Sequence, residues 1–300
     1  MRYVVAVDIG GTDIKAALVD ENFNVIASLS KPTPKQDSSA SKTITAIKEI
    51  VDELSVGYTV SALGVCVCGV FDDENGICIW SGNLGWKNIH LRELLAEKLN
   101  IPVAAGHDIR TAGTAEMKNG AASGYTNSIF IAIGTGIAAS LVLDGSIRSV
   151  GGYAGEIGHL DVGGTAHCVC GQIGCLEAQA SALAISTAYE KATGSTGVST
   201  EEIAQLVRAG DAAATKVWNE AMLALARACE SLITTLSPEA IIFGGGLAKS
   251  KDLLIDPISK ALDQRLTFQR KPELKIAFYE SQAGTIGSAM AAFDLIKEAL

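Results

Sequence analysis

Residues 3–20 read YVVAVDIGGTDIKAALVD, two apolar runs separated by a pair of glycines. Runs of β-branched and aliphatic residues bounded by glycine or polar turns predict strands, here at 3–8 and 14–20. A third run at 24–30 follows a short polar turn. The sequence therefore predicts that the chain opens with three antiparallel strands in a meander.

The remainder of the first half predicts alternating helices and strands. Apolar residues recur at helical spacing over 44–54, and Ser38 or Ser39 can cap that helix. The same patterns then predict, in chain order, a strand at 60–67, a helix near 91–99 and a strand at 102–105. Helices alternating with strands in this way are typical of an α/β domain.

The second half also begins with a hairpin. A helical run at 111–117 precedes two strands, 129–133 and 137–143, that are joined by a glycine turn. Two further helices have N-terminal signals, a capping-box pattern at Ser199 and an aspartate, Asp211. The last predicted elements are a strand at 240–243 and a closing helix at about 284–299.

Composition and charge exclude several classes of protein. The chain has 300 residues, a formal net charge of −9 and 48% hydrophobic residues, a size that favours two domains. Without a block of Lys and Arg, it lacks the basic footprint of a nucleic-acid-binding protein. No apolar run is continuous enough to span a membrane, and the first residues do not resemble a signal peptide. Seven cysteines, an odd number, favour a reducing cytoplasm over a secreted disulfide framework.

Three glycine turns follow apolar strands and are candidate phosphate-binding turns. Glycine lets backbone N–H groups approach an anion without a Cβ in the way. No GxxxxGK[ST] loop occurs, so any phosphate would be held by such turns. Hairpin chemistry alone explains each turn about equally well, but the three together favour one polyphosphate ligand. The candidate residues are Asp8, Gly10, Gly11 and Thr12, then Gly134, Thr135 and Gly136, and finally Gly244, Gly245 and Gly246.

A glycine-rich loop between residues 155 and 181 holds a possible metal site. His159, Cys168, Cys170 and Cys175 offer one imidazole and three thiolates, the ligand set of a closed structural zinc site. Buried, metal-free cysteines are the alternative. His167 is a second candidate ligand, but its adjacency to Cys168 makes it awkward, so His159 is preferred.

Four segments, DIGGTDIKAALVD, GTGIAAS, GGYAGEIGHLDVGG and CVCGQIGCLEAQAS, resemble the ROK family of bacterial sugar kinases and sugar-responsive repressors. The resemblance covers essentially the whole chain. It implies an α/β fold with two RNase-H-like domains of the actin/hexokinase-like ATPase type, closing over ATP and a hexose. We expect a smaller domain at 1–110 and a larger one at 111–283, with the closing helix, 284–300, packing back on the first.

The resemblance places the family's catalytic base on Asp108, which would accept the proton of the attacking sugar hydroxyl. An N-cap for the following helix is the alternative role for this aspartate. The family usually has Asn immediately before and two residues after its base, where this chain has His107 and Arg110. The implied sugar-binding residues are Asn83, His107, Asp108, Glu156, His159 and Glu177.

The function implied by the resemblance is an ATP-dependent hexose kinase that phosphorylates the 6-hydroxyl of glucose or a related hexose. An N-acetylglucosamine or N-acetylmannosamine kinase is the alternative within the class. A sugar-binding regulator without kinase activity is the alternative from another class. The expected cofactors are a structural zinc and magnesium bound with ATP. A hexose and ATP are the expected partners, without nucleic acid or membrane, in a homodimer.

Overall fold

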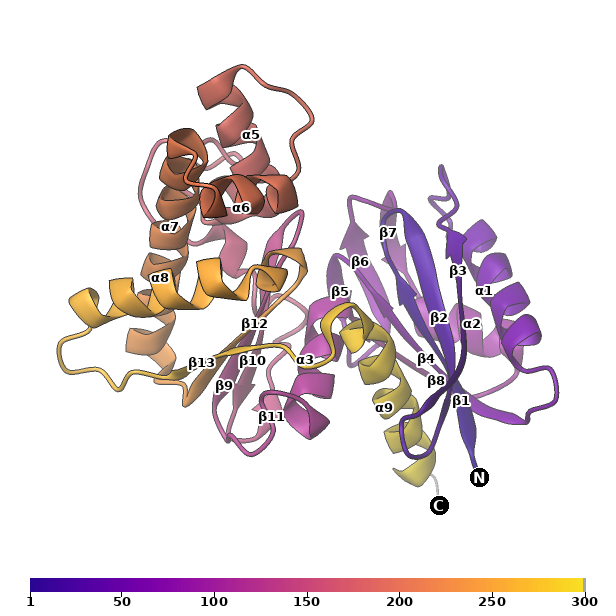
Figure 1. Ribbon diagram of the computed structural model, residues 1–300. Helices are drawn as coiled ribbons and strands as arrows, with labels where there is room; N and C mark the ends of the chain where they lie inside the picture. Colours follow the sequence, from indigo (N-terminus) through magenta and orange to yellow (C-terminus); the bar gives the residue numbers. More distant parts are fainter. Residues whose placement is uncertain (299–300) are drawn as a thin grey trace. The chain divides into compact units, whose positions relative to one another are not determined.

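The protein is described by a computed structural model that covers residues 1–298. The chain divides into two compact units, each of which is described by itself (Figure 1). The first unit consists of Met1–Asn119, Ile147–Ala154 and the residues from Ser281 onward. The second consists of Gly120–Ser146 and Gly155–Glu280. Within the described residues, no helix is both long and apolar enough to cross a membrane.

The first unit is built on a five-stranded sheet with the order β3-β2-β1-β4-β8. Its strands are β1 (Tyr3–Ile9), β2 (Asp13–Asp20), β3 (Val25–Pro32), β4 (Val60–Val67) and β8 (Val103–His107). The first three strands are antiparallel neighbours, which confirms the predicted meander. β4 and β8 add in parallel to the other side of β1, so the carboxyl ends of β1, β4 and β8 lie at one edge of the sheet.

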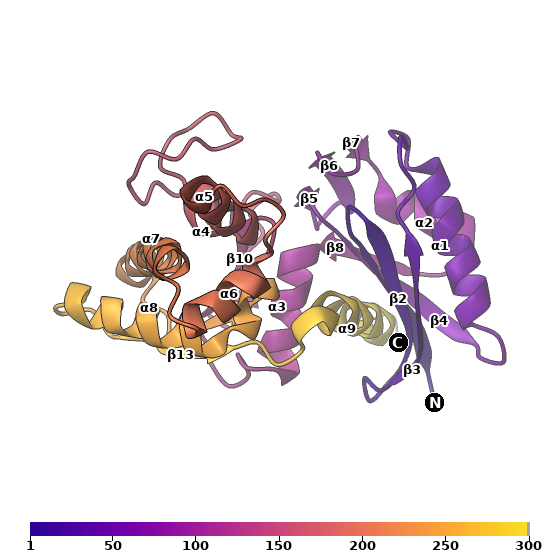
Figure 2. The same ribbon diagram turned by 45° about the horizontal axis from the view of Figure 1, so that its top comes forward.

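Both faces of this sheet are covered by helices (Figures 1 and 2). Alternate residues of a strand point to opposite faces. Val5 and Val7 therefore pack in the cluster that includes Ile47, whereas Val4 packs with Phe293. The helices on the first face are α1 (Ser41–Leu54) and α2 (Leu91–Leu99), and those on the second are α3 (Asp108–Asn119) and α9 (Ala283–Glu298).

The predicted N-caps of α1, Ser38 and Ser39, are wrong. The residue that precedes α1 is Ala40, which makes no side-chain cap. The carboxylate of Asp37 instead accepts hydrogen bonds from the backbone N–H groups of Lys42 and Thr43 at 3.1 and 2.7 Å. Asp37 thus binds the free N–H groups of the first helical turn although it lies three residues before the N-cap position. It can reach them because the chain makes a tight turn at Ala40 before it enters the helix.

Gly64 in β4 is required by the close approach of α9. A Cβ at this position would overlap the backbone carbonyl of Ser288. We expect Gly64→Ala to lower the free energy of unfolding by roughly 1–3 kcal/mol or more, because neither backbone can move without disturbing the core. Urea denaturation measures the effect. Gly246→Ala is the matched control, since a Cβ there meets no atom within 4 Å, and a comparable loss in the control would contradict the packing explanation.

A small antiparallel sheet in the first unit was not predicted. It contains β5 (Val70–Asp72), β6 (Ile77–Ser81) and β7 (Trp86–Ile89). These strands are only three to five residues long and are separated by glycine and asparagine turns, so their apolar pattern is too short to distinguish from loop. The small sheet nevertheless contributes Phe71, Cys78 and Trp86 to the core.

The second unit repeats the sheet of the first. Its strands are β9 (Ser128–Ile133), β10 (Ile137–Leu143), β11 (Ser146–Ile147), β12 (Ala240–Gly244) and β13 (Glu273–Ile276), in the order β11-β10-β9-β12-β13. An antiparallel hairpin is again followed by parallel strands. Counting strands within each sheet in chain order, both have the order 3-2-1-4-5. The two halves of the chain therefore share one topology.

Helices make up most of the rest of the second unit (Figure 2). They are α4 (Glu177–Ala180), α5 (Ala182–Thr193), α6 (Thr200–Arg208), α7 (Ala212–Leu236) and α8 (Lys251–Arg265). α7 packs against the four others and supplies most of the core, including Trp218 and Leu225. The capping box at Ser199 and the N-cap at Asp211 are both confirmed.

Candidate active site

The first glycine turn connects β1 to β2 and is held by side chains that follow β3. The N–H of Gly10 donates to the carbonyl of Asp13 at 3.0 Å. The hydroxyl of Thr33 donates to the Gly10 carbonyl at 2.7 Å, and Lys35 Nζ donates to the Gly11 carbonyl at 2.6 Å. These two residues were not predicted, since neither belongs to a recognisable motif. Thr33 and Lys35 hydrogen-bond to the carbonyl oxygens of the turn, which would otherwise repel an anion.

Asp8 stands at the end of β1, beside this turn. Its Oδ1 lies 3.5 Å from the thiol of Cys66 on β4. A Cβ at Gly284 would lie 2.8 Å from Oδ2, so α9 approaches the carboxylate closely. Burial raises the pKa of Asp8, while the Cys66 thiol and Lys15 act in the opposite direction. A desolvated carboxylate of this kind is suited to bind a cation, because the positive charge stabilises the ionised form of the carboxylate.

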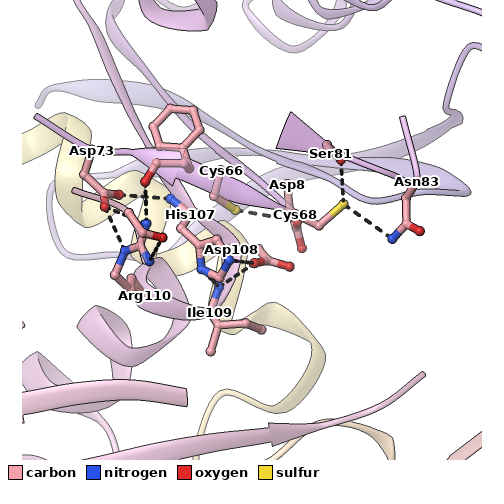
Figure 3. A network of polar contacts seen from close by, with 12 residues as sticks. Asp8, Cys66, Cys68, Asp73, Ser81, Asn83, His107, Asp108, Ile109 and Arg110 are labelled. Atoms are coloured by element: carbon pink, nitrogen blue, oxygen red, sulfur yellow. Dashed lines mark hydrogen bonds and ion pairs between the residues drawn. The ribbon is translucent and has the colours of Figure 1, made fainter. Parts of the chain in front are cut away.

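Asp108 lies where β8 passes directly into α3 (Figure 3). The helix begins at Asp108 itself, three residues earlier than the start predicted near Thr111. Oδ1 of Asp108 accepts a hydrogen bond from the N–H of Ile109 at 2.8 Å and lies 3.3 Å from Nε2 of His107. The side chain is 27% exposed, so a substrate can reach it. Its place at the carboxyl end of a parallel strand is where α/β folds bind ligands.

The residues on either side of Asp108 are buried and held by Asp73, which follows β5. Arg110 Nε donates to Asp73 Oδ2 at 2.7 Å, and the N–H of His107 donates to Asp73 Oδ1 at 3.1 Å. The guanidinium also donates to the carbonyl of Phe71 at 2.7 Å and to that of Gly152 at 3.4 Å. Arg110 is only 3% exposed and therefore links α3, β5 and the loop that contains Gly152.

Removing the Arg110 guanidinium should destabilise the first unit. Arg110→Met keeps an apolar stem but leaves Asp73 Oδ2 and the carbonyl groups of Phe71 and Gly152 without this donor. Hydrogen bonds to charged groups contribute about 1.5–3 kcal/mol, and we expect a loss of at least this size in urea unfolding. Arg208→Met is the control, because the Arg208–Asp252 pair is exposed and should be worth less than about 1 kcal/mol. Equal losses would show that Arg110 makes an ordinary surface ion pair.

Asn83 lies beside the first glycine turn. A Cβ at Gly11 would lie 3.2 Å from the Cβ of Asn83. The amide Nδ2 lies 3.9 Å from the Sγ of Cys68, whose thiol is also 3.8 Å from the hydroxyl of Ser81 (Figure 3). The structure thus brings one predicted sugar-binding residue, Asn83, next to one predicted phosphate turn in the same unit.

The second glycine turn, Gly134-Thr135-Gly136, connects β9 to β10. The N–H of Gly134 donates to the Gly136 carbonyl at 3.0 Å. Oε2 of Glu177 accepts a hydrogen bond from the N–H of Ile137 at 2.8 Å, and a Cβ at Gly136 would lie 2.6 Å from the same oxygen. Gly136 is therefore needed to admit the Glu177 carboxylate. No local sequence pattern predicts this contact, which joins residues 40 positions apart.

The predicted sugar-binding residues Glu156 and His159 lie on either side of Gly158, the residue that approaches Glu177. Glu156 precedes the short 3-10 helix Ile157–His159. A Cβ at Gly158 in this helix would lie 3.2 Å from the Cβ of Glu177. Gly155 has a φ of 100°, and a Cβ there would overlap the carbonyl of Ala139 on β10. This close approach holds the segment that carries Glu156 and His159 against the sheet.

The third glycine turn follows β12. Gly245 has a φ of 81°, and a Cβ there would overlap the backbone of Ile133 at the end of β9. Gly246 lines a cavity of about 230 Å³, whose other walls include Thr200, Lys249 and Ser250. The Gly244–Gly246 turn, which is predicted to border adenosine, therefore lies at a cavity of the second unit.

The four candidate metal ligands come together. Their donor atoms, from His159, Cys168, Cys170 and Cys175, all lie within 4.8 Å of one another. The Sγ atoms of Cys170 and Cys175 are 3.7 Å apart, and Cys168 Sγ is 3.6 Å from His159 Nδ1. With zinc–sulfur bonds of about 2.3 Å, tetrahedral ligands stand about 3.8 Å apart, so the cluster fits zinc. His167, the second candidate, is not part of this cluster.

Comparison with known proteins adds to this geometry. The sequence model of the ROK family matches residues 4–298. The chain belongs to the ROK family. A glucokinase from Halalkalibacterium halodurans is 33% identical over 95% of this chain and 93% of its own. An N-acetylmannosamine kinase from Escherichia coli is 29% identical over 96% and 97% of the two chains.

Among solved structures, the chain is similar to a ROK family glucokinase from Streptomyces griseus in complex with glucose and AMPPNP. The TM-score is 0.85, with 27% identity over 97% of this chain and 99% of the other. The ROK protein described here therefore has the actin/hexokinase-like ATPase fold, as the resemblance implied. The repeated sheet order seen in its two units is the RNase-H-like unit of that fold.

Proposed function

We propose that this ROK protein is an ATP-dependent hexose kinase that transfers the γ-phosphoryl group to the 6-hydroxyl of glucose. The observation that carries the proposal is the position of Asp108, a partly exposed carboxylate at the junction of β8 and α3 in a family that includes glucokinases. Asp108 would accept the hydroxyl proton as the sugar oxygen attacks phosphorus. The bond from phosphorus to the β–γ bridging oxygen then breaks, and ADP leaves.

The glycine turns would hold the nucleotide. In the first unit Asp8, Gly10, Gly11 and Thr12 would face the phosphates, with Asp8 directed toward magnesium. In the second unit Gly134, Thr135 and Gly136 would bind phosphate oxygens, and Gly244, Gly245 and Gly246 would border adenosine. The cavity beside Gly246 supports this assignment. Magnesium bound with ATP supplies charge neutralisation at the phosphates.

The carboxylates would recognise the sugar, because each can accept more than one hydroxyl hydrogen bond. Asn83 in the first unit, with Glu156, His159 and Glu177 in the second, are the proposed contacts, whereas His107 is buried at 5% exposed. A 2-acetamido sugar is the second candidate substrate, favoured by the similarity to an N-acetylmannosamine kinase. A coupled assay of ADP release over glucose, mannose, fructose, N-acetylglucosamine and N-acetylmannosamine tests the proposal. Release with glucose alone supports it, and release with none of these sugars contradicts it.

Zinc is the proposed occupant of the Cys/His cluster, and its role would be structural. Four protein ligands leave no open coordination position for a substrate or water. The metal would fix the loop that leads from His159 to Glu177. A cytoplasmic location is also proposed, because no cysteine of the described residues is in a disulfide. The expected homodimer stays a prediction, which light scattering in solution would check.

A further inference from the structure

His107 and Arg110, which flank Asp108 in the sequence, form one buried assembly beside it (Figure 3). His107 is 5% exposed and Arg110 is 3% exposed. Asp73 binds both of them, through the backbone N–H of His107 and the side chain of Arg110. The assembly therefore fixes the backbone immediately before the proposed base and the first turn of the helix after it.

The imidazole of His107 has a defined protonation state. Burial, with the nearby Arg110 guanidinium, lowers the pKa of His107 to about 3, so the ring is neutral at neutral pH. The N–H of Ile109 donates to Nδ1 at 3.2 Å. Since Nδ1 accepts a hydrogen bond, it carries no proton, and the single ring proton is on Nε2.

The ring nitrogen that carries this proton lies beside the proposed base. Nε2 of His107 lies 3.3 Å from Oδ1 of Asp108. The N–H of Ile109 is shared, since it also donates to this oxygen at 2.8 Å. Oδ1 therefore accepts a hydrogen bond from the backbone and is packed beside the buried imidazole. Contacts on two sides restrict the rotation of the carboxylate.

We propose that His107 is a positioning residue for Asp108, orienting the carboxylate through the contact of Nε2 with Oδ1, while the Asp73–Arg110 pair holds His107 in place. Both ring nitrogens face groups of the protein, which favours this role over a direct hydrogen bond to the sugar. The inference rests on the proposed function, because it assumes that Asp108 is the base.

Two substitutions of His107 distinguish positioning from sugar binding. Glutamine places an N–H donor at about the position of Nε2, whereas leucine fills the space without a donor. Misplacement of a reacting group by about 1 Å costs roughly 10²-fold in rate. We expect His107→Leu to lower kcat about 10- to 100-fold with the KM for glucose nearly unchanged, and His107→Gln to recover most of the rate. A raised KM with unchanged kcat, or equal losses of kcat in both variants, overturns the proposal.

A double variant, His107→Leu combined with Asp108→Asn, distinguishes a failure of this inference from a failure of the proposed function. If His107 acts only through the base, His107→Leu causes no further loss of kcat in Asp108→Asn. An additional loss of the same size as in the wild type overturns the positioning role. If Asp108→Asn alone turns over like the wild type, the proposed function fails, and the positioning role fails with it.

A measurement on the unaltered protein guards against variants that fold poorly. NMR of labelled histidine ring nitrogens reports which nitrogen carries the proton, and the chain has only four histidines to assign. We expect a His107 ring protonated at Nε2 alone that does not titrate between about pH 5 and 8. A ring protonated at Nδ1, or one that titrates in this range, contradicts the inference.

Discussion

Asp108→Asn is expected to lower kcat about 10²–10⁴-fold, the range that general-base catalysis contributes. The amide keeps the shape of the side chain and can still meet the N–H of Ile109 through its oxygen, but it has no capacity to take the hydroxyl proton. Binding of glucose should persist, because a carboxamide retains hydrogen-bonding groups. Steady-state kinetics with glucose, together with calorimetric binding of the sugar, measure both quantities.

Asp52→Asn is a suitable control for this experiment. Asp52 lies on the exposed side of α1 and forms an ion pair with Lys48 at 2.6 Å. Exposed pairs of this kind contribute little to stability, so the control should fold like the wild type. It should therefore retain the wild-type kcat. A kcat close to the wild type for Asp108→Asn would remove this residue from the mechanism, whatever its position in the fold.

Loss of the proposed zinc should have the second large effect. Elemental analysis is expected to find one zinc per chain, and Cys170→Ser should reduce it to a small fraction. Structural zinc binding is coupled to folding, so stability falls with metal content. A loss of about 3 kcal/mol would lower Tm by roughly 6–12 °C in a protein of this size class. Metal analysis and thermal denaturation of the same samples test the two effects together.

Cys229→Ala separates metal loss from general destabilisation. Cys229 is buried in α7 and belongs to the core of the second unit, outside the Cys/His cluster. This variant should lose stability through the small cavity that it leaves, yet keep its zinc. Full zinc content in a variant that lacks both Cys170 and Cys175 would show that the metal is bound elsewhere.

Features that depend on neighbouring residues could be predicted from the sequence. The hairpin around Gly10 and Gly11 and the caps at Ser199 and Asp211 are local, since turn and cap geometry involves residues a few positions apart. The metal cluster was also predictable, because its three cysteines lie within eight residues and a glycine-rich loop can fold them together. The position of Asp108 came instead from the resemblance to the ROK family.

Contacts between distant segments required the tertiary structure. The Asp73–Arg110 pair joins residues 37 apart and the Glu177–Ile137 hydrogen bond joins residues 40 apart, so no local pattern announces either. His107 illustrates the difference most clearly. Its place beside Asp108 is visible in the sequence, but its protonation state is set by burial and by the nearby Arg110 guanidinium. The sequence determined which groups are present at the site, and packing decided which of them are desolvated, charged and aligned, because these properties depend on what folding places around each side chain.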